Sequence, residues 1–175
     1  TFVADYKEIE FDSSLLVDWE YYLYMNKVIV TKYIGTDTEI VMPSIIDVIE
    51  GDVFEESSIS DEITKIVVNP ELKKFSANTF NNLPSLKHFE FIDAKVNLEY
   101  MQNNPSLEKV IVGDIESLAW RGITGFDKLS YIKLTNAEEI SYHHFEGLKA
   151  LKTVIISDKT ERIYQTYIDY GVELD

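Results

Sequence analysis

The chain has 175 residues, which favours a single domain, and its 31 acidic against 16 basic side chains give a net charge of −15. This charge argues against nucleic acid and anionic lipid as partners, because phosphate binding needs concentrated Lys and Arg. Cysteine is absent, which excludes disulfide bonds, thiol nucleophiles and Cys-type zinc sites. No apolar run approaches the roughly 18 residues of a membrane span, so we expect no membrane insertion.

Residues 1–35 predict an N-terminal cap. Residues 1–18 are compatible with either an edge strand or partial disorder. Residues 19–25 and 28–34 are rich in β-branched and aromatic side chains and flank Asn26-Lys27, which predicts a β-hairpin with a two-residue turn. We expect the hairpin to cap the open end of a sheet, since an uncapped edge invites pairing with other chains.

Residues 36–157 are organised as repeats. Ile40 and Met42 open a degenerate first unit, and Pro43 ends its strand. The pattern apolar-x-x-apolar-x-apolar then recurs, starting at positions that lie 21 to 23 residues apart. Side chains alternate along a strand, so the second and third apolar residues of each unit should face inward and the residue before each should face outward. The triplets are Ile63/Ile66/Val68, Leu86/Phe89/Phe91, Leu107/Val110/Val112, Leu129/Ile132/Leu134 and Leu151/Val154/Ile156.

Three further columns of residues predict how the return segments pack. Asn104 is the one break in the second column, and we interpret it as a turn in which backbone hydrogen bonding replaces apolar packing. The first column holds Phe80, Met101, Ile123 and Phe145; the second holds Leu83, Asn104, Phe126 and Leu148; the third holds Ile49, Phe75, Leu98, Leu118, Ile140 and Ile163.

Two other segments stand apart from the repeat. Residues 55–62 form an acidic, Ser-rich insertion, for which we expect a solvated loop. Residues 158–175 predict a C-terminal cap: a helix from Thr160-Glu161 that Gly171 ends, followed by a short strand at 172–174. The helix would present one apolar face made of Ile163, Tyr164, Tyr167 and Ile168.

A period of about 20 to 29 residues with this triplet is typical of leucine-rich repeats. Residues 33–44 resemble the opening of BspA-like (treponemal-type) leucine-rich repeats, and residues 80–86 and 145–151 resemble their return segment. The resemblance covers residues 33 to about 165 and implies secretion or a bacterial cell surface. We therefore expect an α/β solenoid of about 22-residue units, with a parallel strand face, short helical or irregular return segments, an N-terminal hairpin cap and a C-terminal helical cap.

The outward strand positions are the candidate functional surface. They carry three Lys and one His against one Glu, a reversal of the overall charge balance. We interpret them as a mildly basic, partly apolar patch for an extracellular protein segment or an anionic glycan; alternatively, lysines on exposed strands only discourage aggregation. The positions are Lys65, Val67, His88, Glu90, Lys109, Ile111, Tyr131, Lys133, Thr153 and Ile155.

No catalytic, cofactor or metal site is predicted. The sequence lacks a nucleophile elbow, a phosphate-cradling glycine loop and the metal motif His-Glu-x-x-His. His143 and His144 are adjacent, so they do not face one another and are more typical of a solvated surface. We expect a non-enzymatic binding or adhesion module; the alternative is a structural spacer within a larger surface protein.

Overall fold

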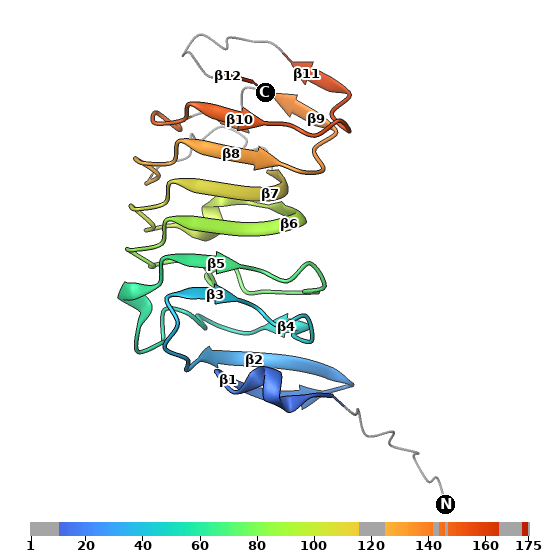
Figure 1. Cartoon of the computed structure of the whole chain (residues 1–175). Helices are drawn as coiled ribbons and strands as arrows, with labels where there is room; N and C mark the ends of the chain where they lie inside the picture. Colours follow the sequence, from blue (N-terminus) through green and yellow to red (C-terminus); the bar gives the residue numbers. More distant parts are fainter. Residues whose placement is uncertain (1–10, 116–124, 142–143, 146, 165–172, 175) are drawn as a thin grey trace, which may run out of the picture.

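A parallel sheet of seven strands forms one face of a solenoid (Figure 1). The computed structural model describes residues 11–115, 125–141, 144–145, 147–164 and 173–174. The seven strands follow one another across this sheet in chain order, which confirms the predicted parallel face; β1, β2, β4, β9 and β11 belong to two smaller sheets. They are β3 (Glu39–Val41), β5 (Lys65–Val67), β6 (His88–Val96), β7 (Lys109–Ile115), β8 (Tyr131–Leu134), β10 (Thr153–Ile155) and β12 (Glu173–Leu174).

The register of the sheet is the one that the triplets predict. The middle residue of each triplet lies opposite the middle residue of the next, so that Ile66 pairs with Phe89 and Phe89 with Val110. A shift of one residue would turn every inward side chain outward, so burial of this set specifies the register. All members of the five triplets are buried except Ile156, which packs partly buried against the core.

The return segments contain short strands and 3-10 helices. Strand β4 (Val48–Ile49) pairs with the N-terminal hairpin, and β9 (Glu139–Ser141) pairs with β11 (Arg162–Tyr164). Every helix in the described part of the chain is a 3-10 helix, so there the fold is a β-solenoid rather than the expected α/β arrangement. Helix nucleation is costly, and these segments are too short to offset it. The three helices are η1 (Ser13–Leu16), η2 (Ser60–Glu62) and η3 (Leu98–Met101).

The N-terminal hairpin forms as predicted, with its turn one residue earlier. Strands β1 (Trp19–Tyr24) and β2 (Lys27–Tyr33) pair antiparallel around Met25 and Asn26, whose φ angles are 46° and 60°. Two successive positive φ values make the turn whose twist matches a hairpin. Strand β2 then pairs with β4, not with β3, so the hairpin caps the solenoid by extending its return side.

The prediction of a C-terminal helix is wrong for residues 162–164. These residues form β11, and Ile163 and Tyr164 are 43% and 50% exposed instead of lining an inner face. The backbone of β9 provides the partner: Glu161 N–H donates to the Glu138 carbonyl at 2.9 Å. The final strand is confirmed at Glu173 and Leu174, which form β12. The expected helix positions Tyr167, Ile168 and Gly171 lie outside the described residues.

The return-segment anchors that are described pack inward as predicted, except Ile163, which is exposed. Phe80, Met101, Leu83, Phe126, Leu148 and Asn104 are buried, Phe145 is partly buried, and Ile123 and Leu118 lie outside the described residues. The acidic insertion is exposed at both ends but not throughout. Ser57 is buried and Ile59 packs partly buried against the core, so the insertion is attached to the solenoid near its middle.

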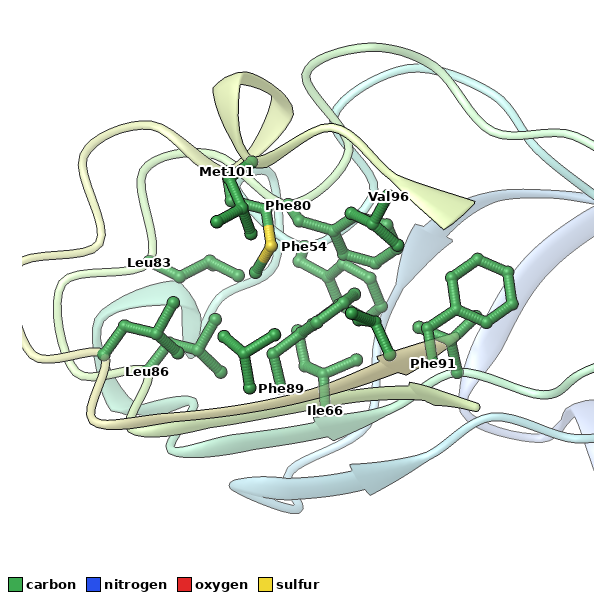
Figure 2. Close-up of a cluster of buried hydrophobic side chains, with 14 of the residues drawn as sticks. Phe54, Ile66, Phe80, Leu83, Leu86, Phe89, Phe91, Val96 and Met101 are labelled. Carbon is green, nitrogen blue, oxygen red and sulfur yellow. The ribbon is translucent and has the colours of Figure 1, made fainter. Parts of the chain in front are cut away.

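Aromatic side chains join the cap to the first repeats. Trp19 lies 5.0 Å from Tyr33 and 5.9 Å from Phe54 between ring centroids. Phe54 then stacks on Phe80 at 5.8 Å, and Phe80 meets Phe89 edge-on at 4.9 Å (Figure 2). Such contacts add stability beyond simple burial. The interior is therefore continuous from the hairpin into the sheet that carries the strand face.

Candidate binding face

All ten predicted outward residues lie on one surface, called here the strand face. The alternation that buries Ile66, Phe89, Val110, Ile132 and Val154 leaves their neighbours on the outer side. Strand pairing aligns these neighbours in two columns, whose members are about 4.8 Å apart along each column. The first column is Lys65, His88, Lys109, Tyr131 and Thr153, and the second is Val67, Glu90, Ile111, Lys133 and Ile155.

The structure adds residues at both ends of the columns. Glu39 lies opposite Lys65, and Val41, which is 70% exposed, lies opposite Val67. Glu173 lies opposite Thr153 at the other end. The excess of positive charge is therefore confined to the middle strands. Sequence reasoning omitted these positions because their units lack a complete triplet, although the alternation around Ile40 was a usable signal.

His88 lies in the first column between two lysines, Lys65 and Lys109. Its Nε2 is 3.6 Å from the Glu90 carboxylate and has no hydrogen-bond partner among the described residues. Partial burial, with Lys109 and Lys65 on the neighbouring strands, lowers the His88 pKa below its ordinary value, against the opposing effects of Glu90 and Glu39. His88 is therefore neutral near pH 7.

The lysines of the strand face differ in their contacts. Lys65 Nζ lies 3.9 Å from the Glu39 carboxylate, a long contact between exposed groups that contributes little stability. Lys109 Nζ lies 5.1 Å from the centroid of the Tyr131 ring, within cation–π range. Lys133 is exposed. All three ammonium groups remain available to a ligand at the surface.

A second candidate is a polar groove that sequence reasoning missed. It has a volume of about 600 Å³ and is lined by residues of β6, β7, β9 and β11 and of the segments that follow β8 and β9. Several of its charged groups already bind one another: Lys95 pairs with Asp114 at 3.0 Å, and Arg162 pairs with Glu139. Two of its four carboxylates, those of Asp114 and Glu139, are thus engaged in ion pairs. Its lining residues are Asp93, Lys95, Gly113, Asp114, Asn136, Glu138, Glu139, Ser141, His144 and Tyr164.

His144 belongs to this groove and is buried, whereas the sequence suggested a solvated surface. Its Nδ1 accepts a hydrogen bond from the Ser141 N–H at 3.2 Å, and its ring meets Phe145 edge-on. Its neighbour His143 lies outside the described residues. Within the described ranges, no group of three or more His, Asp or Glu side chains is arranged to hold a metal ion.

The fold and the strand face together define a parallel-strand solenoid with one extended outer surface. Among the residues described, no helix has the length and apolar character needed to cross a membrane. In comparisons with known proteins, no family model matches the chain, and no curated protein matches it.

Proposed function

We propose that the chain is a non-enzymatic binding or adhesion module that recognises a protein or glycan partner through the strand face. The observation that supports this proposal is the alignment of the ten residues in two columns across five adjacent strands. Solenoids use extended surfaces of this kind for binding, because stacking repeats places equivalent side chains side by side. The mixture of lysines, Tyr131 and aliphatic side chains is also typical of interfaces, whose apolar centres are surrounded by polar groups.

Within this proposal, the chain is a BspA-like leucine-rich repeat protein that is secreted or attached to a bacterial cell surface. Three features of the residues support it: the triplet with its 21- to 23-residue period, the Phe and Leu anchors of the return segments, and the opening at residues 33–44. Such a setting would expose the strand face to extracellular partners. Antibody labelling of intact and of permeabilised producing cells, together with an assay of the culture medium, tests this assignment.

The second candidate is a structural spacer. Contacts within the strand face favour it, because Glu39 lies beside Lys65 and Tyr131 lies beneath Lys109. A face that satisfies part of its own charge needs no partner, and its lysines would then serve only to discourage aggregation.

A pull-down with matched variants distinguishes the two candidates. The chain is immobilised and exposed to serum and mucus extracts beside a variant with Lys65, Lys109 and Lys133 changed to Glu. The control variant changes Lys27, Lys128 and Lys149 to Glu, because these three lysines are exposed and lie outside the strand face. The binding proposal expects a partner, identified by mass spectrometry, that the wild type and control retain and the strand-face variant loses. Equal retention by all three correctly folded proteins, or none, would favour the spacer.

A further inference from the structure

The distribution of charge on the strand face indicates which partner fits it. The chain as a whole carries −15, yet the middle strands β5, β7 and β8 present Lys65, Lys109 and Lys133 outward. The one acidic side chain among the ten, Glu90, is only 21% exposed and lies beside His88, so its charge is held close to the sheet. A ligand approaching this surface therefore meets positive charge first.

Aliphatic side chains accompany these lysines. Val67, Ile111 and Ile155 are half-buried members of the second column, and they alternate with Glu90 and Lys133. Each of the three lysines thus lies on the same strand as one of these aliphatic groups or on an adjacent strand, about 5–7 Å away. A ligand that spans the face must carry both anionic and apolar groups at short intervals.

This combination favours a protein segment over a glycan. Aromatic ring faces are the surfaces against which sugar rings pack, and Tyr131 is the single aromatic residue among the ten. Its ring is already covered by the Lys109 ammonium group at 5.1 Å. An extended peptide, in contrast, carries side chains of different kinds at short intervals, so it can present carboxylates to the lysines and apolar side chains to the aliphatic groups.

We propose, on the basis of the binding function above, that the strand face recognises an extended acidic protein segment. Its carboxylates pair with Lys65, Lys109 and Lys133, and its apolar side chains pack on Val67, Ile111 and Ile155. The four strand spacings from β5 to β10 amount to about 19 Å, which an extended chain covers with about six residues. The recognised segment is therefore short.

Selection from a random peptide library tests this inference. The displayed library is enriched on the immobilised wild-type chain and depleted on the variant with Lys65, Lys109 and Lys133 changed to Glu. We expect the enriched peptides to combine Asp or Glu with apolar residues. Their binding, measured by fluorescence anisotropy, should weaken at least about 10-fold in this variant and on raising the salt concentration, since exposed ion pairs are screened. The control variant at Lys27, Lys128 and Lys149 should bind like the wild type.

Other outcomes would overturn the inference. Enriched peptides that are neutral or basic, that bind equally when their acids are replaced by Gln, or that the strand-face variant retains would contradict an acidic partner. An oligosaccharide of uronic acids that displaces every selected peptide would assign the face to a glycan. Absence of any enriched peptide would also contradict recognition of a protein segment. These results would contradict only the acidic protein partner. The proposed binding function is tested separately by the pull-down, and it is contradicted only when no captured partner depends on the strand face.

Discussion

The side chain of Asn104 accepts a hydrogen bond from the backbone N–H of Leu83, one repeat earlier, at 2.9 Å. Its Nδ2 donates to the carbonyl oxygens of Phe80 and Met101 at 2.8 and 2.9 Å, and the residue is fully buried. A single amide thus satisfies three backbone groups of two successive turns. Asn69 makes the equivalent contacts near the first turn, donating to the carbonyls of Pro43 and Ile46.

The first prediction concerns this contact. Replacing Asn104 by Leu, the residue of the same column at positions 83 and 148, should lower the free energy of unfolding by on the order of 3 kcal/mol, because each buried backbone group left unpaired costs about 1–3 kcal/mol. Urea unfolding followed by circular dichroism measures the change. Gln102→Ala, at an exposed neighbouring position, serves as the control and should change stability by less than about 0.5 kcal/mol. A Leu variant as stable as the wild type would show that apolar packing replaces these bonds.

The second prediction concerns the aromatic contacts that join the cap to the repeats. Phe80 is 1% exposed and touches Phe54, Phe75 and Phe89. Phe80→Ala should therefore lower stability by about 3–5 kcal/mol, the usual effect of leaving a cavity in place of a buried aromatic ring. Thermal and urea unfolding report the loss. Tyr24→Ala removes a ring that is 57% exposed, and a comparable loss in that variant would contradict the assignment of the effect to core packing.

The third prediction separates two roles of glycine. A Cβ at Gly113 would lie 2.5 Å from the Asp93 carbonyl carbon and 2.7 Å from the Ala94 nitrogen, so backbone atoms of β6 leave no room for it. Gly113→Ala should destabilise the chain by about 1–3 kcal/mol through overpacking. Gly51 has a φ of 74° and open space around it, so Gly51→Asn meets no clash and should cost less than Gly113→Ala, because Asn tolerates a positive φ better than most residues. Equal effects of the two substitutions, measured by urea unfolding, would contradict the close approach at β6.

The fourth prediction concerns pH. The His88 pKa lies below its ordinary value because of partial burial and the flanking Lys109 and Lys65. In the unfolded chain, His88 has its ordinary pKa of about 6.5. As the pH falls from about 7 past this value toward the lower pKa of the folded chain, the unfolded chain binds more protons than the folded chain. His88 therefore makes the chain less stable over that interval. His88→Gln, which cannot take up this proton, should reduce the loss of stability.

Urea unfolding at several pH values between 5 and 7.5 measures this difference. The wild type and the Gln variant share every other titrating group, so the difference between their two curves isolates the contribution of His88. Parallel curves would mean that His88 has the same proton affinity in the folded and unfolded chains.

Much of the strand face could be predicted because its geometry follows from local rules. Side chains alternate along any strand, so the apolar positions of a triplet specify which neighbours face outward. Equal spacing between triplets then aligns Lys65 with His88 and His88 with Lys109, as the pairing shows. Asn104 was identified by the same reasoning, as the one polar residue in an otherwise apolar column.

The positions that sequence reasoning misjudged depend on partners far away in the chain. Residues 162–164 have an apolar pattern compatible with a helix, yet they form a strand because they pair with the edge of β9. The hairpin was recognisable from its own residues, but its pairing with β4 depends on an edge formed by a later segment. The polar groove likewise combines Asp93, Asp114 and Glu139 from successive turns.

The sequence by itself thus determined the parallel strands, their register and the outward residues, because a period of two within each strand and of about 22 between strands is carried by every unit. Only the tertiary structure decided where the hairpin docks and how the C-terminal segment pairs. These features involve strands at the edges of small sheets. The partner of such a strand belongs to another turn of the solenoid, so the pattern of residues within the strand does not reveal it.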